Sequence, residues 1–267
     1  MKRALLAAAC LMAVSAMATP VAVTPGAQAA TTAPMTRAAT VRLAPMIAFD
    51  GVYIPALSQT SNASQKPEAG PAATAAMARL RQAWPALREN LAGAWGASAP
   101  AGWAQTLERV DQQIAQADRA TASAKWHDAH EALEEVRLVL MRARVAGGLD
   151  YFVDRLTAYH EPMEVIALTG AQVKPADLDA TRLASLRNAF TQASELWQAI
   201  RRVQVDPVTY ALDTRRAPQL SQGLTDEDAA LQALGSALAG TDASAILRAA
   251  AAVKPPFARV FTAFGQP

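Results

Sequence analysis

Apolar residues recur at helical spacing through most of this chain. From residue 72 onward they return every three or four positions, and Gly and Pro fall mainly between the resulting segments. The pattern predicts helices over residues 72–95, 102–120, 124–146, 150–168, 178–203, 225–239, 242–253 and 256–264. No run of alternating β-branched residues indicates a sheet. The predicted fold class is therefore all-α, an antiparallel helical bundle.

The N-terminal residues have the pattern of a secretory leader. Lys2 and Arg3 precede a short apolar stretch, and a small-x-small cleavage site ends at Ala18, so residues 1–18 are predicted to be a signal peptide. Cys10, the only cysteine, lies inside this leader, and the spacing before it disfavours a lipoprotein. A periplasmic or secreted protein without disulfides is expected. No apolar stretch is long enough to span a bilayer.

Four further segments follow the leader. Residues 19–45 are rich in Ala, Thr and Pro and are predicted to be a flexible linker, and residues 46–71 an extended segment followed by linker, because Pro55 limits the apolar stretch there. Residues 72–168 and 169–267 are predicted to be two helical halves. A weak repeat at an offset of about 106, which matches Tyr53 with Tyr159 and Trp84 with Phe190, favours duplication of one helical unit.

Composition excludes several classes of function. Without Lys2 and Arg3 the chain has 23 basic and 23 acidic residues, and no basic stripe, so neither nucleic acid nor anionic lipid is an expected partner. A Gly-rich phosphate loop and a Gly-x-Ser-x-Gly elbow are both missing from the sequence. No enzyme class is favoured.

All three histidines fall between residues 127 and 160, each with carboxylates one helical turn away. His127, His130, Glu131 and Glu134 have spacings that place them along one stripe of a helix. His160 and Glu164 are spaced i and i+4 on the next predicted helix. The two stripes are the only concentrated chemistry in an otherwise alanine-rich chain.

The turn between these two helices sets their relative height. Gly147 and Gly148 end the first helix and predict a short antiparallel hairpin. Glu134 lies 13 residues before Gly147, and Glu161 lies 13 after Gly148. At about 1.5 Å rise per residue, the two stripes therefore match in height. Whether they face each other depends on helix rotation, which the pattern leaves open.

Imidazole nitrogens and carboxylates are ligands for Zn, Fe, Cu or Mn, and helical bundles build such sites from facing helices. The predicted direct ligands are His130, Glu134, His160 and Glu164. His127 and Glu131 are further candidates, and Asp154 is predicted to orient a ligand by a hydrogen bond. The leading hypothesis is an exported protein that binds one transition-metal ion for sequestration, sensing or delivery.

Other interpretations fit the same residues. The cluster is also consistent with a buried His–carboxylate network or with a solvated helix face. A metal-free helical module that binds a protein partner through an apolar groove near residues 53–57 is the alternative function. The third is a b-type haem or small-ligand protein with His130 or His160 as the axial residue; covalent haem is excluded because Cys-x-x-Cys-His is missing.

Overall fold

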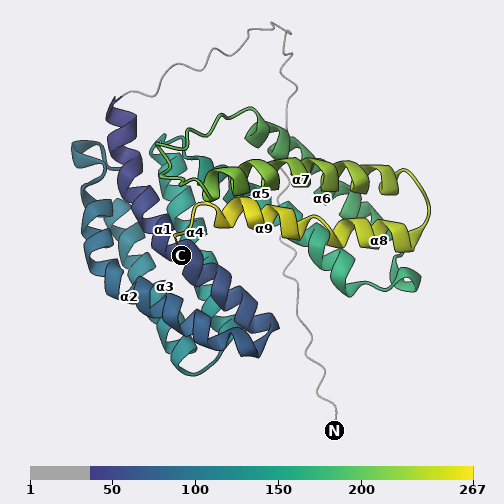
Figure 1. Cartoon of the computed structure of the whole chain (residues 1–267), viewed down its shortest axis with the longest axis horizontal. Helices are drawn as coiled ribbons and strands as arrows, with labels where there is room; N and C mark the ends of the chain where they lie inside the picture. The colour runs from purple at the N-terminus through teal and green to yellow at the C-terminus, as the bar shows by residue number, and fades with distance from the viewer. Residues whose placement is uncertain (1–36, 267) are drawn as a thin grey trace, which may run out of the picture. The chain divides into compact units, whose positions relative to one another are not determined.

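The structure is a computed structural model that describes residues 37–266. All regular secondary structure in this range is helical, which confirms the predicted all-α fold class (Figure 1). The α-helices are α1 (Arg37–Gln65), α2 (Gly70–Gly93), α3 (Trp103–Ala122), α4 (Trp126–Ala146), α5 (Phe152–Gln172), α6 (Ala180–Arg201), α7 (Arg216–Leu238), α8 (Ala243–Ala251) and α9 (Lys254–Thr262). Three single-turn 3₁₀ helices lie in the connections, at Pro67–Ala69, Gly96–Ser98 and Pro175–Asp177.

The helices pack in two groups, which Figure 1 shows in purple to teal and in green to yellow. In the first, α1 packs on α2 and α4, and α3 packs on α2 and α4. In the second, α5 packs on α6 and α8, and α7 packs on α9, α8 and α6. Contacts of α5 with α4, and of α9 with α1, join the groups, and one continuous set of buried apolar side chains fills both.

The predicted extended segment is wrong, because residues 46–65 belong to α1. Met46, Phe49, Tyr53 and Leu57 form a buried stripe at helical spacing, and each is at most 3% exposed. Pro55 lies within this helix. The ring removes one backbone N–H and crowds the carbonyl of Gly51, four residues earlier, which instead accepts from the backbone nitrogen of Gln266 over 2.7 Å. The burial of the stripe outweighs the remaining cost. The predicted linker 19–45 is also wrong from residue 37 onward, where α1 begins.

Two other N-terminal predictions are affected by the range of the structure. The leader, residues 1–18, and the first part of the linker lie outside the described residues. Within residues 37–266, none of the helices combines the length and apolar character that crossing a membrane requires.

The predicted hairpin is only partly present. Helix α4 ends at Ala146 with Gly147 as its C-cap, and Gly148 takes the left-handed conformation with φ of 71° before α5 begins. However, α4 lies mainly against α3 and α1, and it meets α5 over a short stretch only. The stripe of α4 that contains Leu133, Val136 and Leu140 is buried within the first group of helices, so α5 is left to build the second.

Both groups contain the same polar triad. In each, a Trp and an Arg one turn later on one helix bind an Asp on the next helix. The residues are Trp84, Arg88 and Asp111 on α2 and α3, and Trp197, Arg201 and Asp228 on α6 and α7. In the triads the equivalent of Trp84 is Trp197, whereas the sequence repeat matches Trp84 with Phe190. The two alignments differ by about two helical turns. The predicted duplication stays a prediction, and these triads support it in a different register.

Gly170 permits a close backbone contact between α5 and α8. A Cβ added there would lie 2.3 Å from the backbone nitrogen of Ala251 and 2.7 Å from the carbonyl oxygen of Leu247, so α5 and α8 would have to separate. We expect Gly170→Ala to lower the free energy of unfolding by about 1–3 kcal/mol or more. Gly93→Ala is the matched control, because a Cβ there meets nothing within 4 Å. That change should instead raise stability by up to about 1 kcal/mol, since Ala is the better helix former. Urea unfolding checks both signs.

Candidate functional site: a His–carboxylate cluster between α4 and α5

The structure brings the four predicted direct ligands into one cluster. His130 and Glu134 project from α4 and His160 and Glu164 from α5, and Arg137 of α4 contacts both Glu134 and His160. Their side chains are 17–25% exposed, so the cluster is mostly buried but reachable from solvent. Each His lies one turn before its Glu, which gives the two pairs the same internal geometry on both helices.

His130 is held by the backbone of α1. Its Nδ1 lies 3.3 Å from the carbonyl oxygen of Leu57. A carbonyl can only accept, so Nδ1–H donates and the neutral ring has its free lone pair on Nε2. That nitrogen lies 3.5 Å from Oε1 of Glu134. Two acceptors therefore face each other across this gap, an arrangement that a proton or a cation between them stabilises.

Arg137 connects the pair on α4 with the pair on α5. Its guanidinium forms an ion pair with Glu134, and its Nη2 donates to Nδ1 of His160 over 2.6 Å. A guanidinium only donates, so the neutral His160 ring carries its proton on Nε2. Arg137 is buried, and its guanidinium lies 5.9 Å from the ring of Phe261 on α9. One protein cation thus lies between the two predicted pairs of ligands.

Glu164 is held from the second group of helices. Its Oε1 accepts from Nζ of Lys254, at the start of α9, over 2.9 Å. Its Oε2 lies 3.7 Å from Nε2 of His160 and is buried with no hydrogen-bond partner among the described residues. Such an unsatisfied carboxylate oxygen is a free acceptor in a largely desolvated position.

Burial and the two cations keep both imidazoles neutral. Desolvation is the main cause that lowers the pKa of His130 to about 4. The pKa of His160 is held well below its ordinary value by desolvation first, and then by the positive charges of Arg137 and Lys254. Desolvation raises the pKa of Glu134, against the opposing effect of Arg137. Neutral imidazole is the form that coordinates a metal.

The remaining predicted residues lie apart from these four. His127 and Glu131 are exposed on α4. Asp154 does not orient any ligand of the cluster; it is buried and its two oxygens accept from the guanidinium of Arg144. Arg144 is a stronger partner for Asp154 than a histidine, because its guanidinium donates to both carboxylate oxygens at once.

Sequence reasoning missed the two cations. Arg137 follows Glu134 by three residues, a spacing that usually marks a solvent-exposed pair on a helix surface. Lys254 is 90 residues from Glu164 in the chain, and nothing in the local pattern relates them. The i+3 spacing to Glu134 was the one available signal.

The described side chains do not form a finished coordination sphere. Within residues 37–266, no group of three or more His, Cys, Asp or Glu side chains is arranged to hold a metal ion. The physical reason is that Arg137 lies between the pairs and Lys254 holds one oxygen of Glu164. Each pair therefore offers one nitrogen and one oxygen that are 3.5 Å apart on α4 and 3.7 Å apart on α5.

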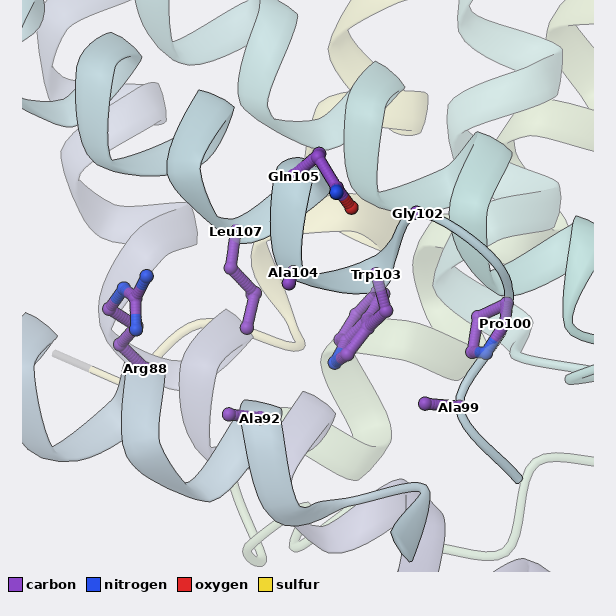
Figure 2. Close-up of a pocket in the computed structure, with 9 residues that line it drawn as sticks. All are labelled: Arg88, Ala92, Ala99, Pro100, Gly102, Trp103, Ala104, Gln105 and Leu107. Carbon is purple, nitrogen blue, oxygen red and sulfur yellow. The ribbon is translucent and has the colours of Figure 1, made fainter. Parts of the chain in front are cut away.

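A separate surface pocket lies at α2, α3 and the connection between them (Figure 2). It has a volume of about 390 Å³ and is lined by Arg88, Ala92, Ala99, Pro100, Gly102, Trp103, Ala104, Gln105 and Leu107. Its one charged side chain, Arg88, is already bound to Asp111. The pocket therefore lacks the convergent polar groups of a binding site.

The apolar groove predicted near residues 53–57 would need exposed apolar side chains, but the largest apolar side chains of this segment are buried. Tyr53, Ile54 and Leu57 are at most 3% exposed and belong to the core. The hydroxyl of Tyr53 donates to the carbonyl oxygen of Leu133 over 2.6 Å, which ties α1 to α4 just below His130 and Glu134.

Fold and site together define an all-helical protein with a partly buried His–Glu–Arg cluster between two helix groups. The chain matches no protein-family model, and comparison with curated proteins and with solved structures finds no significant similarity.

Proposed function

We propose that this chain binds one transition-metal ion between α4 and α5, with His130, Glu134, His160 and Glu164 as ligands. The ion would be Zn, Fe, Cu or Mn, which accept imidazole and carboxylate ligands. The biological role would be sequestration, sensing or delivery, in the periplasm if residues 1–18 act as a leader.

One observation carries the proposal. Nε2 of His130 and Oε1 of Glu134, both acceptors, face each other 3.5 Å apart. Two ligands of a tetrahedral ion with bonds of 2.0–2.2 Å are separated by roughly 3.4 Å, so one metal ion fits between these atoms. The hydrogen bond from His130 to the carbonyl of Leu57 fixes the ring as such bonds fix metal-ligating histidines.

The pair on α5 supports the same proposal. Nε2 of His160 and Oε2 of Glu164 are 3.7 Å apart, and that oxygen lacks a hydrogen-bond partner among the described residues. For Nε2 to bind a metal, the proton must move to Nδ1 or leave, and the bond from Arg137 to Nδ1 must break. Both helices would then contribute one nitrogen and one oxygen.

Metal binding is tested by elemental analysis and by thermal unfolding with Zn²⁺, Cu²⁺, Fe²⁺ and Mn²⁺. At a free metal concentration about a hundredfold above the dissociation constant, the folded state should gain about 2.7 kcal/mol. The double variant His130→Ala/His160→Ala should lose this gain. His127→Ala is the control, since His127 is exposed on the same helix and should leave it unchanged.

The alternative, a metal-free network that only joins the helices, predicts a different result. None of the four metals would then shift unfolding, and His130→Ala/His160→Ala would destabilise the chain equally with and without metal. That outcome would sink the metal proposal.

A further inference from the structure

The charges of the cluster already cancel without a metal. Glu134 and Glu164 are its carboxylates, and Arg137 and Lys254 are the cations bound to them. A divalent ion added to this set would leave an excess of two positive charges in a mostly buried place. The positive charges of the ion, Arg137 and Lys254 would repel one another strongly, because solvent is largely excluded from the cluster.

We propose that Arg137 and Lys254 are built-in counter-cations that a divalent metal ion must displace, so that loading exchanges two protein cations for one ion. This inference rests on the proposed metal site. Once both cations leave, two carboxylates and one divalent ion again sum to zero charge. Each cation binds a group that the metal needs, at the atom beside the proposed ligating one: Arg137 binds Oε2 of Glu134 and Nδ1 of His160, and Lys254 binds Oε1 of Glu164.

Arg137 is incompletely satisfied where it lies, which makes its displacement less costly. Its Nε is buried and has no hydrogen-bond partner among the described residues. A buried donor without a partner destabilises the present position of the side chain. Lys254 has a simpler path, because 39% of its side chain is exposed and can turn into solvent.

The exchange also links metal loading to α9. Lys254 begins α9 and, through Glu164, joins that helix to α5. Displacing Lys254 removes this polar link, while the aromatic contact of Phe257 with Tyr159 of α5 remains. Metal loading should therefore loosen the start of α9 without detaching the helix.

The test is a Zn²⁺ titration of the full chain and of Arg137→Gln and Lys254→Gln. We expect Arg137→Gln to bind Zn²⁺ at least about tenfold more tightly than the unchanged chain, and Lys254→Gln several-fold more tightly, because a repelling charge is removed. Arg137→Lys keeps the charge and should bind several-fold less tightly than Arg137→Gln. Arg259→Gln is the matched control: Arg259 is also on α9 and pairs with Asp226, away from the cluster, so affinity should not change.

The outcomes separate the two proposals. If the unchanged chain binds Zn²⁺ and neither Gln variant binds it more tightly, the exchange is wrong and the metal site stands. If the unchanged chain and both variants all fail to bind, the metal site is wrong and the exchange with it. Binding only in the variants supports the exchange. Should Arg137→Gln fail to fold, Lys254→Gln decides, since its side chain is partly exposed.

Discussion

Asp154→Ala should lower the free energy of unfolding by about 3–5 kcal/mol, measured by urea denaturation at neutral pH. Arg144 is 2% exposed, and its Nε lies 2.9 Å and 3.1 Å from the two oxygens of Asp154. Removing Asp154 leaves this guanidinium buried without its main partner. Asp50, which is also buried, cannot replace it fully, because it accepts from the hydroxyl of Tyr151 over 2.6 Å.

Two comparisons isolate the buried charge as the cause. Asp150→Ala removes a carboxylate of the same region that is 74% exposed and paired with Arg155, and stability should change by less than about 0.5 kcal/mol. The double variant Arg144→Met/Asp154→Leu should recover most of the loss, since it removes both charges and keeps apolar volume. A double variant as unstable as Asp154→Ala would show that shape rather than charge is responsible.

This ion pair illustrates what the sequence could and could not predict. The helices from α2 to α9 follow from apolar spacing, because a stripe every three to four residues is satisfied only by a helix with one buried face. Helix α7 is predicted only in part, since it begins at Arg216 and the predicted helix at residue 225. Helix α1 was not predicted because Pro45 and Pro55 resemble helix breaks. The helix forms because Met46, Phe49 and Tyr53 are buried against other helices. Packing against other helices therefore determines the conformation of this segment, and the local sequence pattern does not show that packing.

The candidate site divides in the same way. Helical spacing and the glycine turn predicted that the two His/Glu stripes match in height, since heights along a helix follow from residue number alone, and in the structure Arg137 contacts both Glu134 and His160. The rotation of each helix and the angle at which the helices cross do not follow from residue number. They depend on how α4 packs against α1 and α3, and they put Arg137 between the pairs and Asp154 beside Arg144.

Glu227 is a buried carboxyl, whereas the equivalent position in the first group of helices has an apolar side chain. It lies on α7, directly before Asp228 of the second triad, and is 0% exposed; Val110 precedes Asp111 of the first triad and is also 0% exposed. The hydroxyl of Tyr159 on α5 donates to Oε1 of Glu227. Its Oε2 has no partner among the described residues. The fold therefore favours the protonated, uncharged acid at this position.

Stability should consequently fall as pH rises, and Glu227→Gln should remove most of that fall. Desolvation is the main cause that raises the pKa of Glu227 from 4.5 to about 8, opposed by hydrogen bonds from Tyr159 and the backbone of Phe257. Because the folded chain holds this proton more tightly than the unfolded one, the stabilising contribution is complete below pH 4.5 and is lost as pH rises through 8. Over that window the loss amounts to roughly 5 kcal/mol. Urea unfolding of the unchanged chain and of Glu227→Gln between pH 4.5 and 9 measures the difference, which cancels the contributions of all other groups. Glu195→Gln, an exposed carboxyl on α6, should run parallel to the unchanged chain. A Glu227→Gln curve parallel to it as well would show that the folded chain accommodates the charged carboxylate.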